Sequence, residues 1–170
     1  MKLYTTSGSM DFMEFLRNKY TNERMVVMHG VGNSVVLHET ESKSVFQTPL
    51  SYEVIGSENP LKEEGFFAFN YMPVTDEGRP LFEHWTLRHI DSVSSQHGFI
   101  AYRILRPTKG DHYAILTQWT GRFFYEEWQR TPSYKTLMAT EVKGTGLEAQ
   151  PYLFTSAPYI STYKVKTDEE

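Results

Sequence analysis

The chain has 170 residues, of which 39% are hydrophobic and 15% aromatic, and its formal net charge at pH 7 is -4. This length and apolar content suffice for one sizeable domain or two small ones. The slightly acidic balance gives no electrostatic footprint for nucleic acid or an anionic membrane surface. The chain contains no cysteine, which excludes disulfides, thiolate metal sites and cysteine nucleophiles. No apolar run approaches the ~20 residues of a membrane-spanning helix, so we expect a soluble, cytoplasmic protein.

The first 60 residues are predicted to be rich in β-strands. The expected elements are a strand at residues 2–6, an amphipathic helix at 10–19, strands at 25–29, 34–39 and 45–47, and a further short element at 52–55. The turn sequence Gly-Val-Gly-Asn at residues 30–33 is typical of a hairpin. In the helix, Phe12, Phe15 and Leu16 have the spacing of a buried face. A polar segment with Pro60 follows, and it predicts a division into residues 1–62 and residues 63–170.

After this boundary the predicted order is strand, helix, strand, strand, helix, strand. The segments are 66–74, 78–93, 99–105, 113–119, 121–130 and 159–165, with a short extra helix that Thr131 and Pro132 begin. This βαββαβ order is the split βαβ arrangement, so the fold class is α+β and ferredoxin-like. Helices cover one face of such a sheet, and a second sheet must cover the other. We expect the N-terminal β-rich part to provide it, in a pseudo-dimeric sheet packing within one chain. A monomer is then favoured over a homodimer, which light scattering would test.

Several sequence segments carry a family resemblance. Residues 115–138 (ILTQWTGRFFYEEWQRTPSYKTLM) have a strand ending in Trp, a helix carrying a second Trp and a further short helix. The segments HETES from residue 38, SYEVI from residue 51 and YRILRP from residue 102 occur at matching separations. With these features the chain resembles the antibiotic-biosynthesis monooxygenase superfamily over essentially its whole length. It is most similar there to IsdG-type heme-degrading monooxygenases and to their two-part HmoB and TRAP-like group.

The resemblance implies catalytic roles for Asn70 and Trp128. Asn70 matches the family's pocket Asn, which hydrogen-bonds near the distal side of the iron. Trp128 matches a Trp that packs against the heme and distorts it. From the residues alone, a polar side chain within GFFAFNYM would need a partner if buried. Trp128 is equally consistent with ordinary packing of a helix on a sheet, because it follows Phe124 by one helical turn.

Met138 stands where the family has the His that ligates heme iron. A thioether is a weaker donor to ferric iron and raises the reduction potential where it does ligate heme. Met138 is thus a candidate heme contact, and the alternative is a flexible side chain that fills a gap in the core. No His lies near it in the sequence. His89 and Trp85 share one face of the helix predicted at 78–93, so His89 is a second candidate for heme binding. The alternative places His89 at the surface, near the helix C-terminus.

The sequence lacks the motifs of several other enzyme classes. The sequence contains no phosphate-binding glycine loop, no G-x-S-x-G elbow and no clustered His and carboxylate set for a non-heme metal. The resemblance implies heme as both substrate and cofactor, together with O₂ and an external reductant or reductase. We therefore expect a monooxygenase that degrades heme and releases iron. The alternative is a non-catalytic, TRAP-like heme-binding or stress-linked regulatory protein that has lost the ligand His.

Overall fold

A computed structural model describes residues 1–138 and 153–165 of the chain. The strands are β1 (Lys2–Gly8), β2 (Met25–His29), β3 (Ser34–Thr40), β4 (Leu50–Glu58), β5 (Phe66–Pro73), β6 (Phe99–Pro107), β7 (His112–Trp119) and β8 (Tyr159–Lys164). The helices are α1 (Met10–Lys19), α2 (Arg79–His89), the 3₁₀ helix η1 (Ile90–Ser95), α3 (Arg122–Gln129) and α4 (Pro132–Met138). None of these helices is long and apolar enough to cross a membrane.

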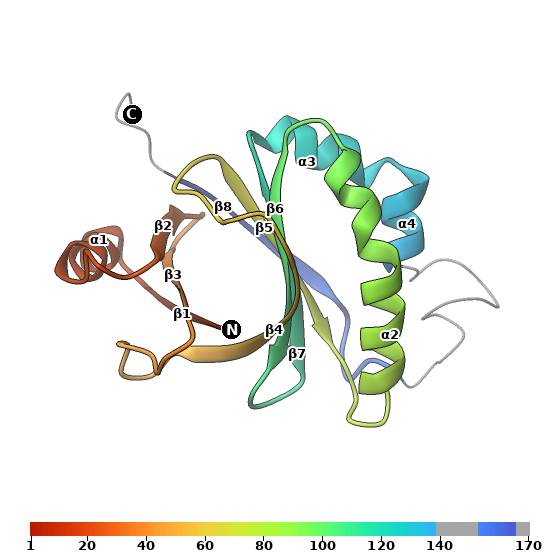
Figure 1. The fold of residues 1–170 in the computed structure, drawn as a ribbon, viewed down its shortest axis with the longest axis horizontal. Helices are drawn as coiled ribbons and strands as arrows, with labels where there is room; N and C mark the ends of the chain where they lie inside the picture. Colours follow the sequence, from red (N-terminus) through yellow and green to blue (C-terminus); the bar gives the residue numbers. More distant parts are fainter. Residues whose placement is uncertain (139–152, 166–170) are drawn as a thin grey trace.

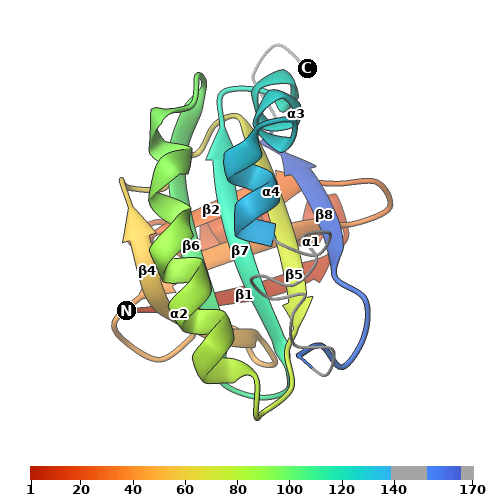
Figure 2. The same cartoon turned by 90° about the vertical axis from the view of Figure 1, so that its right-hand side faces the viewer.

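The strands form a closed barrel in the order β1-β3-β2-β8-β5-β7-β6-β4. Within it, the order β8-β5-β7-β6 is that of the predicted ferredoxin-like sheet, and all its neighbouring pairs are antiparallel. Strands β1 to β3 run across this sheet on the side away from α2, α3 and α4 (Figures 1 and 2). The α+β, ferredoxin-like prediction is confirmed, and the N-terminal part supplies the second sheet. The division at residue 62 and the monomeric state stay predictions.

Three apolar clusters explain why the strands are apolar on both faces. Side chains of Phe67, Phe69 and Leu116 fill the barrel interior. On the other face of the ferredoxin-like sheet, Phe66, Ala68 and their neighbours pack against α2, α3 and α4. A third cluster joins α1 to the outer face of β1 to β3. Strands covered on both faces lack a hydrophobic–polar alternation, which is why β5 reads as a nearly continuous apolar run.

Two seams join the sheets. At the first, β4 pairs with β1 on one edge and with β6 on the other. At the second, β2 meets β8 at a single residue pair, His29 and Lys164. Gly30 follows directly, and a Cβ atom there would lie 2.8 Å from the ring of Tyr163. The close approach of the two strands therefore requires glycine at position 30.

Three local predictions were wrong. Residues 45–47 form bends, because the Ser44 hydroxyl accepts the Phe46 amide at 2.9 Å and replaces a ladder bond. The buried face of α1 carries Met13, whereas Phe12 and Phe15 are exposed. The α-helix predicted at 78–93 ends at His89, and residues 90–95 continue as a 3₁₀ helix. In that segment, serine hydroxyls bond carbonyls three residues back, as at Ser92 and His89, which favours the tighter turn.

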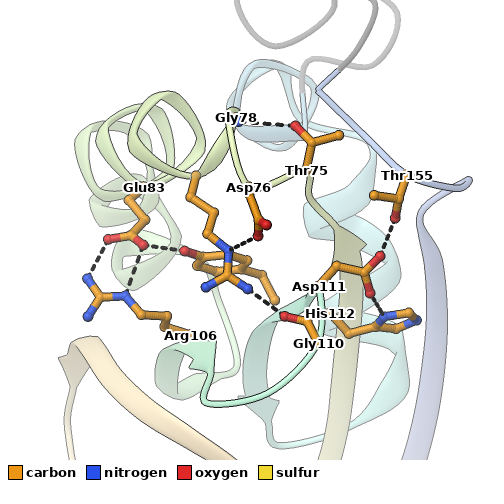
Figure 3. Close-up of polar contacts among 11 residues, drawn as sticks. Thr75, Asp76, Gly78, Glu83, Arg106, Gly110, Asp111, His112 and Thr155 are labelled. Carbon is orange, nitrogen blue, oxygen red and sulfur yellow. Dashed lines mark hydrogen bonds and ion pairs between the residues drawn. The ribbon is translucent and has the colours of Figure 1, made fainter.

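A polar network fixes the first half of α2 to the sheet (Figure 3). Both carboxylate oxygens of Glu83 accept hydrogen bonds from Arg106, at 2.9 and 2.6 Å, and the Tyr113 hydroxyl also donates to Glu83. Arg79 donates to the carbonyl of Gly110 at 2.5 Å. The Arg106 guanidinium is the main cause that holds the pKa of Glu83 below its ordinary value.

We expect Glu83→Gln to lower the free energy of unfolding at pH 7 by about 1–2 kcal/mol, since a bidentate charged contact becomes a neutral one. Because the pKa of Glu83 is lower in the folded state, its contribution is present above the ordinary glutamate pKa of about 4.5 and is lost as pH falls. Urea unfolding at pH 7, 5 and 3 should show the difference between variant and wild type shrinking with acid. Glu127→Gln is the control, because its pair with Arg130 is exposed. An unchanged difference at pH 3 would contradict this interpretation.

Candidate functional site

Asn70 lies on β5 and faces the helices, on the opposite side of the sheet from Phe69. Its side chain is buried, with 3% exposure. The amide nitrogen of Asn70 donates to the hydroxyl of Tyr125 at 3.3 Å, and the hydroxyl of Tyr134 donates to the amide oxygen at 3.5 Å. The partners that a buried Asn requires are therefore two tyrosines, one from α3 and one from α4.

Gln129 joins these three residues into what we call the Asn70 cluster: Asn70, Tyr125, Gln129 and Tyr134. The Gln129 amide donates to the Tyr125 hydroxyl at 3.2 Å and to the Tyr134 hydroxyl at 3.5 Å. Burial raises the pKa of Tyr125 above its ordinary value, and the neighbouring Tyr134 adds to this. The Tyr125 hydroxyl is therefore neutral at physiological pH. The cluster is a group of neutral hydrogen-bonding side chains set within an apolar layer.

Trp128 packs beside the Asn70 cluster and is 1% exposed. Its indole and the Tyr134 ring form a T-shaped pair with a centroid distance of 4.8 Å, and the Trp119 ring lies 5.4 Å away. The indole N–H groups of Trp128 and Trp119 are buried and have no hydrogen-bond partner among residues 1–138 and 153–165. A buried donor without a partner costs roughly 1–3 kcal/mol, and a bound molecule that brought an acceptor to either group would remove that cost.

Met138 is the last residue of α4 and is 8% exposed. It belongs to the same apolar cluster as Trp128 and Leu137, between the helices and the sheet. The structure therefore brings Asn70, Trp128 and Met138 into one layer, although they come from three different elements. In the described part of the chain, no group of three or more His, Asp or Glu side chains is arranged to hold a metal ion. The Met138 thioether is a soft donor in this layer, and Met72 belongs to the same cluster.

His89 and Trp85 lie together but turn toward α4. Their rings are 4.2 Å apart, and the Trp85 indole donates to the carbonyls of Thr136 and Leu137 at 3.1 and 3.2 Å. His89 lines a separate open cavity of about 380 Å³ whose lining includes neither Asn70 nor Met138. Burial, followed by Arg88 and His84, lowers the pKa of His89 and favours the neutral imidazole at the end of α2.

Sequence reasoning missed three members of the Asn70 cluster: Tyr125, Gln129 and Tyr134. One signal for them was available, since Tyr125 and Gln129 are four residues apart and therefore adjacent on a helix. Tyr134 follows the predicted cap at Thr131, whose hydroxyl accepts the Tyr134 amide at 3.2 Å and confirms the cap. The contact between Tyr134 and Asn70 spans 64 residues, and no local pattern predicts it.

The layer suits a planar, largely apolar ligand. It offers aromatic rings, two indole donors that have no partner in the described part of the chain, thioethers and an amide that neutral tyrosines hold in place. Among residues 1–138 and 153–165, the side chains that hydrogen-bond to Asn70 are two tyrosines, which are neither an activated nucleophile nor a carboxylate pair. Difficult chemistry here would thus come from a bound group, and the chain would position it. Toward a heme iron, the Met138 thioether would be a weaker donor than an imidazole.

Comparisons with known proteins agree with this architecture. A family model described as antibiotic biosynthesis monooxygenase matches residues 65–140. The signal transduction protein TRAP of Staphylococcus epidermidis is 31% identical over 130 residues, which cover 76% of this chain and 77% of that protein. The structure of a major regulator of staphylococcal pathogenesis superposes with a TM-score of 0.87 at 23% identity, covering 98% of this chain and all of that one.

LmHde, a heme-degrading enzyme from Listeria monocytogenes, has the same fold. Its TM-score is 0.75 at 18% identity, and the match covers 98% of this chain and 100% of LmHde. At such identities the two superpositions show a shared fold. The sequence match to TRAP goes further, because it combines higher identity with coverage of more than three quarters of both chains. The chain therefore belongs to the family of the signal transduction protein TRAP, and the antibiotic biosynthesis monooxygenase model matches its residues 65–140.

Proposed function

We propose that the layer between the helices and the sheet binds heme and that the protein degrades it by oxidative cleavage, releasing iron. The main support is the convergence of Asn70, Trp128 and Met138 in one buried layer, at the positions that the IsdG-type resemblance assigns to the heme pocket. The fold shared with a heme-degrading enzyme is consistent with this proposal. Heme would then be the substrate and would also supply the oxygen chemistry, with electrons from outside the chain.

The residues of the layer have distinct tasks in this proposal. The indole of Trp128 contacts the macrocycle and, backed by Trp119 and Tyr134, resists being pushed aside. A ligand atom that reaches Asn70 would replace the Tyr134 hydroxyl, whose two contacts of 3.5 Å, with Asn70 and Gln129, are the longest in the cluster. Met138 would offer its thioether to the iron. The chain has no cysteine to hold an iron–sulfur cluster, so an external reductant or a reductase supplies the electrons.

A second function is favoured by Met138 itself. A thioether binds ferric iron weakly, and it stabilises the reduced state without the electron donation that oxygen activation requires. A heme-binding protein without degrading activity, of the TRAP-like regulatory type, would retain the aromatic layer and lose the imidazole. The two functions share the binding step and differ in the fate of the heme once its iron has been reduced.

Titrating the protein with hemin and then adding ascorbate in air tests both functions. We expect a saturable Soret shift at micromolar hemin, followed by loss of the Soret band and release of iron that ferrozine detects. A bound heme that survives ascorbate would favour the non-catalytic function. Absence of any Soret shift at micromolar hemin would refute both. Trp128→Phe should slow degradation more than it weakens binding, because contact with the reacting ring acts on the reaction step.

A further inference from the structure

The barrel interior opens at one end into a cavity of about 790 Å³. A second cavity of about 320 Å³ shares Thr48, Leu50 and Tyr71 with the first. We call this opening the barrel mouth, and we define it by the aromatic residues that line the two cavities: Tyr52, Tyr71, His112, Tyr159 and Tyr163. Its volume lies in the range of small-molecule sites. Tyr71 follows Asn70 on β5, so the mouth and the Asn70 cluster lie on opposite faces of the sheet.

The aromatic rings of the mouth form a continuous wall. The Tyr71 ring lies 5.0 Å from Tyr159 and 6.4 Å from His112, and the His112 and Tyr159 rings are 5.7 Å apart. Asp111 holds the His112 ring through a 2.6 Å contact with Nδ1, and the Thr155 hydroxyl donates to the same carboxylate (Figure 3). Fixed rings of this kind offer stacking and edge contacts to a flat aromatic ligand.

The tyrosine hydroxyls of the mouth are the second observation that points to a ligand. Tyr52 and Tyr163 are 3% and 9% exposed, yet neither hydroxyl has a hydrogen bond to the described residues, and the same holds for Tyr71 and Tyr159. Burial raises the pKa of Tyr52 to about 12, and it raises that of Tyr71 further above its ordinary value. These phenols therefore stay protonated at neutral pH, and in the open cavities that they line they can donate hydrogen bonds to a bound molecule.

Two features limit the shape and charge of the ligand. Below the mouth, the barrel is filled by Phe67, Leu105 and Leu116, each fully buried, so a long acyl chain has no room to enter. At the rim, Lys109 and Asp111 contribute opposite charges, and His112 and Thr155 already engage the Asp111 carboxylate. The mouth therefore suits a compact, uncharged molecule better than a chain or an ion.

We propose that the barrel mouth is a second binding site, for a small planar aromatic molecule that carries carbonyl oxygens, such as a quinone or an aromatic ketone. The rings of Tyr71, Tyr159 and His112 contact its faces and edges. Its oxygens accept hydrogen bonds from the phenol hydroxyls, of which Tyr71 is the central one because it lines both cavities. The site is independent of heme, and its ligand does not touch the Asn70 cluster.

The site is tested by titrating the protein with 1,4-naphthoquinone and monitoring the binding through the NMR chemical shifts of the protein. We expect saturable binding of one molecule per chain, with the largest shifts at Tyr71, His112 and Tyr159. Naphthalene, which has the same rings without the oxygens, should bind about tenfold more weakly, and Tyr71→Phe should weaken quinone binding by about the same factor. Tyr102→Phe is the matched control, because the Tyr102 hydroxyl donates to Asp91 at 3.2 Å on the helix side of the sheet.

Three outcomes would overturn the proposal. Absence of binding at millimolar quinone would refute the site. Equal affinity for naphthalene, or unchanged affinity in both Tyr71→Phe and Tyr52→Phe, would refute the role of the hydroxyls. NMR shifts confined to residues near Asn70 and Trp128 would place the ligand between the helices and the sheet and not in the barrel mouth. Thermal unfolding of each variant ensures that a loss of binding is not a loss of fold.

Discussion

Replacing Arg103 by alanine should lower the free energy of unfolding by about 3–5 kcal/mol, the largest effect that we expect from a single substitution outside the apolar core. Arg103 and Glu39 are 5% and 8% exposed and form an ion pair across the barrel, with contacts of 2.6 and 3.2 Å. Removing the guanidinium leaves a buried carboxylate without its partner, and the desolvation of that charge is no longer offset.

The same guanidinium also holds the segment that leads into the ferredoxin-like sheet. One Arg103 nitrogen donates to the carbonyls of Asn59 and Tyr102 at 2.8 and 2.7 Å. Nearby, the buried Gln118 amide donates to the carbonyls of Lys62 and Glu64. Loss of Arg103 therefore releases backbone acceptors as well as a carboxylate, so the effect should exceed that of removing a simple ion pair.

Urea unfolding of four variants separates these contributions. Arg103→Met with Glu39→Met should be more stable than Arg103→Met alone, because the double variant leaves no buried charge unpaired. Arg130→Ala is the surface control and should cost less than about 1 kcal/mol, since its pair with Glu127 is exposed. A loss below about 1 kcal/mol in Arg103→Ala would show that water reaches the pair and that the barrel end is open.

This ion pair also explains two of the sequence segments behind the family resemblance. Glu39 belongs to HETES and Arg103 to YRILRP, and 64 residues separate them. The segments could be recognised as markers, but their meeting across a barrel is a long-range contact that no local pattern encodes. The spacing of apolar residues did predict the ferredoxin-like elements, because strand and helix periodicities are local. Closure of the barrel depends instead on close approaches such as that of Gly30 to Tyr163.

The candidate site, like the fold, could be predicted only in part from the sequence. Asn70, Trp128 and Met138 could be named from the sequence because the resemblance aligns single positions. Their hydrogen-bonding partners could not, since Tyr125 and Tyr134 reach Asn70 only after α3 and α4 pack on β5. The barrel mouth was not predicted at all. Its tyrosines come from β4, β5 and β8, and on each strand they read as ordinary aromatic core positions.

Met138→His should raise the affinity for hemin on the order of tenfold or more and produce the spectrum of a five-coordinate, imidazole-ligated ferric heme. The physical reason is that an imidazole donates more strongly to ferric iron than a thioether, and position 138 already lies in the layer with Trp128. Breakdown of the heme with ascorbate in air should then be faster than in the wild type. Optical titration and single-turnover decay of the Soret band measure the two effects separately.

Met138→Leu is the matched control, because it keeps the buried volume and removes the sulfur. If the thioether touches iron in the wild type, this substitution should change the spectrum of the bound heme, whereas it should leave the spectrum unchanged if the methionine only fills space. His89→Ala tests the other candidate ligand. A wild-type spectrum of imidazole type that disappears in His89→Ala would assign iron to the His89 side of α4. That result would refute the role proposed for Met138, because the cavity that His89 lines is lined by neither Asn70 nor Met138. The proposal that the protein binds heme would stand.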